Sequence, residues 1–133
     1  MFSITHKINF QQTDRGGILF YAELFNIAHI TYERLFDSFE LEENYFDSPN
    51  YAIPIIHTEA DYFTPINFRD EVECSVYIEN IKTTSFELFY IFKVNNELVA
   101  KMQTIHVVVN QSNFEKAEIP KDLLYKLKKN LGK

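Results

Sequence analysis

Hydrophobic and polar positions alternate along the first segment of the chain. Between Phe2 and Gln12, the apolar side chains fall mainly at even-numbered positions. Successive side chains of a strand point to opposite faces, so this spacing predicts a strand with one buried face. The alternation stops at residues 13–17, where Gly16 and Gly17 indicate a turn because glycine adopts backbone angles that other residues avoid.

From Phe20 to Phe39 the apolar positions recur every three or four residues, which predicts a helix. The apolar side chains cover most of its circumference, so we expect a helix buried on several sides. The following segment, Glu40 to Asn50, carries four acidic residues and is interpreted as a surface loop or short helix.

The rest of the chain is rich in β-branched and aromatic residues, which favour strands. Turn residues divide it, and Asn95-Asn96-Glu97 indicates a tight hairpin. A terminal helix over 120–131 begins with a proline and has leucines at helical spacing. The four predicted strands are 51–63, 71–81, 85–94 and 98–109.

One strand, one long helix and then four strands predict an α+β fold, with a five-stranded antiparallel sheet curved around the helix. We find no repeat or linker, so we expect one domain over 1–133. Open sheet edges and an uncovered outer face predict a partner subunit.

Composition narrows the function. The net charge of −6 argues against a nucleic-acid partner, which needs a basic surface. Cys74 is the only cysteine, so neither an intramolecular disulfide nor a thiolate metal cluster can form, and we interpret it as a small core or surface residue rather than a nucleophile. The N-terminal residues lack the pattern of a signal peptide, and no apolar run has bilayer length. We expect a soluble, cytoplasmic protein without a membrane span.

The candidate chemistry lies where the turn meets the long helix. Free backbone N–H groups at a helix start carry a partial positive charge and can stabilise an oxyanion. Asp14 lies one turn away, where its carboxylate could attack a thioester carbonyl or deprotonate a water. The alternative is a plain turn, in which Asp14 hydrogen-bonds locally and the glycines supply the geometry.

The run 13–25 resembles the D-x-x-G-x-x-x-Y/F signature of the 4-hydroxybenzoyl-CoA thioesterase family, through Asp14, Gly17 and Tyr21. Residues 29–33 and 53–65 resemble the branch that hydrolyses 1,4-dihydroxy-2-naphthoyl-CoA. The resemblance implies a hot-dog fold with Asp14 as the catalytic aspartate, Gly17 in its turn, and the Tyr21 backbone N–H polarising the thioester carbonyl. It also implies a homodimer or homotetramer with sites at subunit interfaces, and no cofactor, since CoA is part of the substrate.

Other polar residues could serve the same site. His29 and Glu33 lie four apart on the helix; they either line the acyl pocket or form a polar pair bonded to strand backbone in the core. Two such ligands do not make a metal site. His57 is either a hydrogen-bonded structural residue or a pocket residue, and Phe20 is a candidate pocket wall. Arg69, Lys82 and Lys101 are candidates to hold CoA phosphates.

Three functions remain open from the sequence. The first is hydrolysis of an aromatic acyl-CoA, such as dihydroxynaphthoyl-CoA. The second is hydrolysis of a short or medium aliphatic acyl-CoA or acyl carrier protein thioester. The third is a non-catalytic module that binds acyl-CoA, although binding alone would not require a carboxylate such as Asp14 beside the thioester.

Overall fold

The computed structural model describes residues 1–133. It contains two helices, seven strands and one 3-10 turn: β1 (Phe2–Lys7), η1 (Phe10–Gln12), α1 (Tyr21–Ser38), β2 (Tyr51–Ala52), β3 (Ile55–Tyr62), β4 (Glu71–Ile81), β5 (Ser85–Val94), β6 (Glu97–Val107), β7 (Val109–Asn110) and α2 (Lys121–Lys129).

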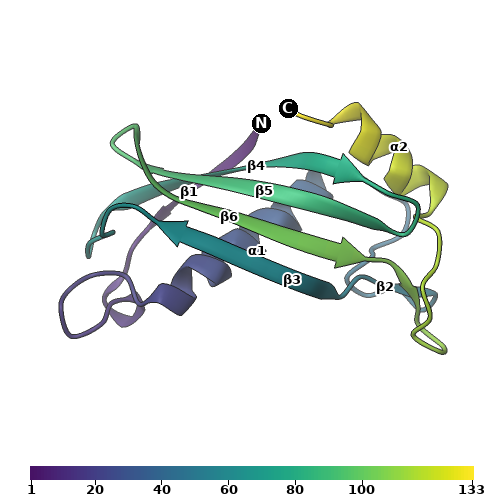
Figure 1. Ribbon diagram of the computed structural model, residues 1–133, viewed down its shortest axis with the longest axis horizontal. Helices are drawn as coiled ribbons and strands as arrows, with labels where there is room; N and C mark the ends of the chain where they lie inside the picture. Colours follow the sequence, from purple (N-terminus) through teal and green to yellow (C-terminus); the bar gives the residue numbers. More distant parts are fainter.

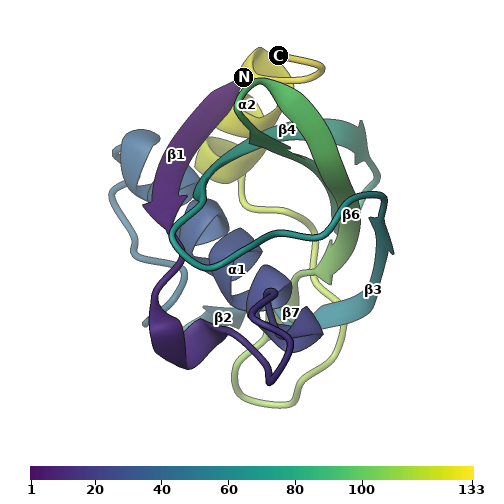
Figure 2. The ribbon, with the colours of Figure 1, turned by 90° about the vertical axis from the view of Figure 1, so that its left-hand side faces the viewer.

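Five strands form one antiparallel sheet in the order β1-β4-β5-β6-β3. The sheet curves around α1, which lies in its concave face (Figures 1 and 2). The short strands β2 and β7 pair separately, and α2 packs beside β4. This arrangement confirms the predicted α+β fold with a five-stranded sheet around one long helix.

The predicted strands 71–81 and 85–94 match β4 and β5 residue for residue. The hairpin at Asn95 and Asn96 is also confirmed, since both residues have the positive φ of a two-residue turn. Three strand predictions were too long, and one of them, 98–109, runs past the end of β6 at Val107 into β7. The first strand stops at Lys7 and residues 10–12 form a 3-10 turn instead, and the predicted strand 51–63 breaks at Pro54, which has no N–H to donate.

The core joins the concave face of the sheet to one side of α1. It contains 26 buried residues, including Leu24 and Ile27 of α1 and Phe86 and Phe92 of β5. The helix is less enclosed than its apolar pattern predicted, because one side of it, including Ile30 at 42% exposure, faces solvent. Neither helix is long and apolar enough to cross a membrane.

Cys74 lies in β4 within this core and is fully buried. Burial raises the pKa of its thiol to about 12, because the charged thiolate loses its hydration there. A neutral, enclosed thiol is a poor nucleophile, so of the two predicted places the structure shows that Cys74 is a core residue.

The strand β3 forms the open edge of the sheet, next to β6. Seven of its eight residues are exposed, and the eighth is partly buried. It runs alongside α1, with Tyr62 near the start of the helix, since the Tyr62 hydroxyl donates to the Tyr21 carbonyl over 2.6 Å. An exposed edge strand with free backbone groups can pair with another strand.

Candidate active site

The segment between η1 and α1 is a tight, internally bonded loop. The Asp14 N–H donates to the Ile18 carbonyl over 2.8 Å, and the Gly17 N–H donates back to the Asp14 carbonyl over 3.0 Å. Gly17 has a φ of +79°, a value that favours glycine over residues with a Cβ atom. The loop is anchored to its surroundings, because the Leu19 N–H donates to the Ile66 carbonyl over 2.6 Å.

This loop orients the carboxylate of Asp14. Its Oδ1 atom accepts a hydrogen bond of 2.8 Å from the Gly16 N–H, and the side chain is otherwise exposed. Arg15 forms no ion pair with Asp14. The carboxylate therefore keeps its second oxygen free of protein partners.

The start of α1 lies beside Asp14. Phe20 is the residue before the first turn, and its N–H donates to the Gln12 carbonyl over 2.8 Å. The N–H groups of Tyr21 and Ala22 have no intrahelical partner because they begin the helix, and no capping side chain accepts from them. These N–H groups lie at the positive end of the helix dipole, where a negative oxygen is stabilised.

Asp14 and Tyr21 line the same cavity of about 480 Å³. Its other walls come from Phe20, Ile18 and the segment 62–66. The volume lies in the range of small-molecule sites, and the walls are mainly apolar. A thioester held here would have a carboxylate and free backbone donors beside its carbonyl. The plain turn accounts for the bond between Asp14 and Gly16, but not for this cavity.

Phe20 lies in the Asp14 cavity, whereas His29 and Glu33 lie further along α1. His29 is exposed and lines a second cavity, described below, while Glu33 lines neither. Both side chains are exposed, so the interpretation of a polar pair buried in the core is wrong. The amphipathic period shows that His29 and Glu33 share a side of the helix, but not whether a sheet covers that side. No group of three or more His, Cys, Asp or Glu side chains gathers as a metal site would require.

His57 lies on the convex face of the sheet, away from α1. It pairs with Ile105, whereas the neighbouring His106 points into the core. Its side chain is 52% exposed and lies 3.7 Å from the carboxylate of Glu59. The bulge between Ile55 and His57 produces this orientation, and alternation along the sequence does not reveal it.

Of the three candidates for CoA phosphates, only Arg69 lies near the Asp14 loop. Its neighbour Phe68 donates from its N–H to the Gly17 carbonyl over 3.1 Å, and the guanidinium lies over the Phe68 ring at 4.9 Å. Lys82 lies in the β4–β5 turn, next to α2, and Lys101 in β6 on the convex face.

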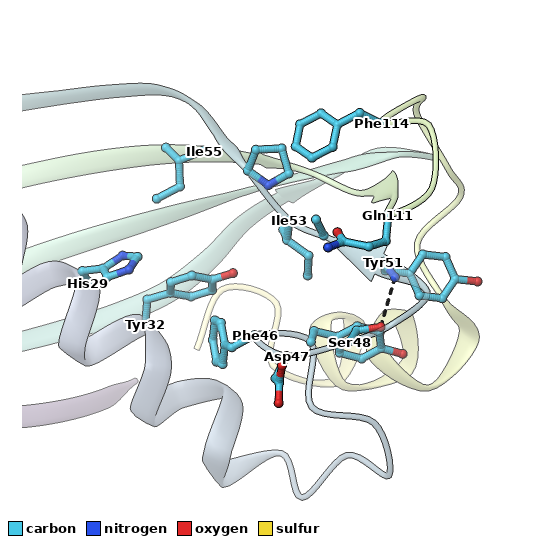
Figure 3. A pocket seen from close by; sticks show the side chains of 13 residues that line it. His29, Tyr32, Phe46, Asp47, Ser48, Tyr51, Ile53, Ile55, Gln111 and Phe114 are labelled. Atoms are coloured by element: carbon cyan, nitrogen blue, oxygen red, sulfur yellow. Dashed lines mark hydrogen bonds between the residues drawn. The ribbon is translucent and has the colours of Figure 1, made fainter.

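The structure adds two features that the sequence analysis missed. The first is Tyr62, whose hydroxyl donates a hydrogen bond to the Tyr21 carbonyl. Burial, together with the nearby Tyr21 side chain, raises the pKa of this hydroxyl, so it stays protonated and can donate. A second cavity of about 470 Å³ lies between α1 and the segment 45–55, with Tyr32 in its wall (Figure 3). The family resemblance includes the segments that contain Tyr32 and Tyr62, yet no local sequence pattern marks either tyrosine as part of a site.

Comparison with known proteins shows the family of this chain. The sequence profile of the thioesterase-like superfamily matches residues 8–127. A 1,4-dihydroxy-2-naphthoyl-CoA hydrolase of Nostoc punctiforme is 29% identical over 97% of this chain and 88% of its own length. One from Prochlorococcus marinus is 30% identical over 90% of this chain and 85% of its own length.

Solved structures show the same fold at lower identity. A 1,4-dihydroxy-2-naphthoyl-CoA thioesterase from Synechocystis has a TM-score of 0.87 at 22% identity, with 95% of this chain and 94% of that chain covered. A Staphylococcus aureus protein solved in complex with CoA has a TM-score of 0.86 at 16% identity, with 99% and 86% covered. The fold and the match over most of the chain show that this protein belongs to the thioesterase-like superfamily and is a thioesterase with the hot-dog fold.

Proposed function

We propose that this thioesterase hydrolyses an aromatic acyl-CoA of the dihydroxynaphthoyl-CoA type to the free acid and CoA, with Asp14 as its catalytic group. The observation that carries the proposal is the apolar cavity lined by both Asp14 and the start of α1. The relatives from Nostoc and Prochlorococcus support this substrate class, because both are 1,4-dihydroxy-2-naphthoyl-CoA hydrolases by name.

The geometry supports a simple sequence of steps. The thioester carbonyl oxygen lies against the free N–H of Tyr21, which stabilises the negative charge that forms on it. The Asp14 carboxylate attacks the carbonyl carbon or deprotonates a water that does so. The carbon–sulfur bond then breaks, and CoA leaves as a thiolate that takes up a proton. Water supplies the new oxygen of the acid, directly or by hydrolysing the acyl–Asp14 anhydride.

We also propose a homodimer or homotetramer with each active site at a subunit interface. The exposed edge strand β3 supports this, because it passes directly beside the Asp14 cavity through Tyr62. In this proposal the protein is cytoplasmic, with the acyl-CoA pool as its substrate source. Phe20 and His29 serve as contacts for the acyl group. Glu33 and His57 have less support as substrate contacts, because Glu33 lines neither cavity and His57 lies on the convex face of the sheet.

The test is thiol release from a panel of aromatic and aliphatic acyl-CoA thioesters, with wild type and Asp14→Asn. We expect aromatic thioesters to be the best substrates and Asp14→Asn to lose about 10³-fold or more in kcat. Asp37→Asn is the matched control, because Asp37 is an exposed carboxylate at the opposite end of α1. Full activity in Asp14→Asn would refute the assignment of Asp14, and a preference for aliphatic thioesters would favour the alternative substrate class.

A further inference from the structure

The second cavity has a mainly apolar wall that also contains polar side chains, among them Asp47, Ser48 and Gln111. It lies between α1 and the segment 45–55, has a volume of about 470 Å³, and is lined mostly by hydrophobic side chains. Phe46, Ile53 and Ile55 form part of this wall, and His29 stands at one end (Figure 3). A cavity of this size and character can accommodate an aromatic ring system.

Tyr32 differs from the other polar residues of this wall, because its hydroxyl is buried and unpaired. Its side chain is only 2% exposed, and its hydroxyl has no hydrogen-bond partner in the protein. Figure 3 shows the hydroxyl pointing into the cavity, toward Ile53. Burial raises the pKa of the hydroxyl, so it stays protonated and can donate. Buried hydroxyls are nearly always paired, which indicates a partner that enters the cavity.

The ring of Tyr32 packs against three other rings, which orient its hydroxyl. It packs edge-on against Phe46 and Phe36, with ring centroids 5.1 Å and 4.9 Å away. The buried imidazole of His106 lies behind it at 4.5 Å. A buried donor in a mainly apolar wall recognises an oxygen atom at one defined place, and therefore discriminates between ligands that carry that oxygen and ligands that lack it.

Within one chain this cavity is too far from Asp14 to share an aromatic acyl group. Tyr21 and Tyr32 are 11 residues apart on α1, which corresponds to about 16 Å along the axis. That span exceeds the length of a one- or two-ring acyl group. A thioester bound at Tyr21 would therefore leave the Tyr32 cavity of its own chain empty.

In a dimer joined through β3, the Asp14 cavity of one copy lies close to the Tyr32 cavity of the other. Tyr62 lies at the Asp14 end of β3, and Ile55 lies at the Tyr32 cavity. When an edge strand pairs antiparallel with its own copy about a two-fold axis, the end of one strand lies beside the start of the other. The Asp14 cavity of each copy then faces the Tyr32 cavity of its neighbour.

We propose that the Tyr32 cavity of one copy receives the distal ring of the acyl group whose thioester lies at Asp14 of the other copy. The Tyr32 hydroxyl donates a hydrogen bond to an oxygen substituent on that ring. This inference rests on the proposed function and makes Tyr32 a specificity-determining residue for oxygen-substituted aromatic thioesters. Two independent experiments test its two parts.

The first experiment compares wild type with Tyr32→Phe on matched thioesters, 4-hydroxybenzoyl-CoA against benzoyl-CoA and 1,4-dihydroxy-2-naphthoyl-CoA against 2-naphthoyl-CoA. We expect kcat/KM to fall about tenfold for at least one hydroxylated thioester and to stay within about twofold for its unsubstituted counterpart. The fold should survive, since the hydroxyl has no protein partner to lose. Tyr125→Phe is the control, because Tyr125 is an exposed tyrosine on α2.

The outcomes separate the inference from the proposed function. An equal change for both members of every pair would overturn the role of Tyr32 while aromatic hydrolysis stood. Hydrolysis of aliphatic thioesters alone would overturn the proposed substrate class, and the inference with it.

The second experiment tests whether the cavity serves the neighbouring copy. Asp14→Asn chains and Ile53→Trp chains, in which the indole fills the cavity, are co-expressed with different tags and purified as mixed dimers. One site of such a dimer carries both changes and the other carries neither, so we expect about half of the wild-type activity from the mixed dimer and none from the Ile53→Trp homodimer. An inactive mixed dimer would overturn the shared site. His29→Trp is the second blocking variant if Ile53→Trp does not fold, because His29 is exposed at the cavity.

Discussion

The two glycines after Asp14 have different tasks, and substitutions can separate them. Gly17 has a φ of +79° and open space around the position of an added Cβ. An alanine there meets no steric contact, so its whole cost comes from the left-handed backbone, about 1 kcal/mol. For a chain of 133 residues this lowers Tm by about 4 °C. Asparagine tolerates such angles, so Gly17→Asn should lower Tm by clearly less than Gly17→Ala.

Gly16 has no positive φ, so its substitution causes no comparable backbone strain. Its Cβ would instead lie 3.3 Å from Oδ1 of Asp14, which is closer than most such contacts. The carboxylate must then move by a few tenths of an ångström. Because a displacement of about 1 Å in a catalytic group can cost about 10²-fold in rate, we expect Gly16→Ala to lower kcat about three- to tenfold, with Tm nearly unchanged.

The assay combines thermal unfolding with kcat for the best thioester of the panel, for wild type, Gly16→Ala, Gly17→Ala and Gly17→Asn. The expected pattern is a loss of activity without loss of stability at position 16, and a loss of stability that asparagine relieves at position 17. Equal Tm values for the two Gly17 variants would refute the backbone argument. A Gly16→Ala enzyme with wild-type kcat would show that the carboxylate does not need the position that the loop gives it.

Two further predictions concern groups around α1. Tyr62→Phe removes the hydrogen bond to the Tyr21 carbonyl, and we expect kcat to fall about threefold while unfolding free energy drops by less than about 1 kcal/mol, measured by urea unfolding. Burial lowers the pKa of His106 to about 3, so the unfolded chain binds a proton below about pH 6.5 that the folded chain does not. The unfolding free energy should therefore fall as the pH is lowered from about 6.5 to 3. Chemical unfolding of His106→Gln should show a shallower fall over the same range, and an unchanged slope would contradict the prediction.

The sequence predicted most of the fold because the fold follows from periodic patterns. The strands β4 and β5 pack one face each on the helix, so alternation located both of them to the residue. The errors fall where backbone chemistry overrides side-chain pattern. Pro54 interrupts an otherwise strand-like run, and the 3-10 turn at 10–12 ends the first strand although Phe10 continues the alternation. Phe10 is in fact 77% exposed.

The Asp14 loop could be predicted from the sequence, whereas the Tyr32 cavity could not. Asp14, Gly17 and Tyr21 are neighbours in the chain, so a local motif carries their relation. The Tyr32 cavity is assembled from α1, the segment 45–55 and residues 111–114, which no local pattern connects. The helical period of apolar residues between Phe20 and Phe39 includes Tyr32, because most of its ring is apolar. Whether the hydroxyl at the tip of the ring finds a partner depends on the surrounding packing, and only the three-dimensional structure shows that it points, unpaired, into a cavity.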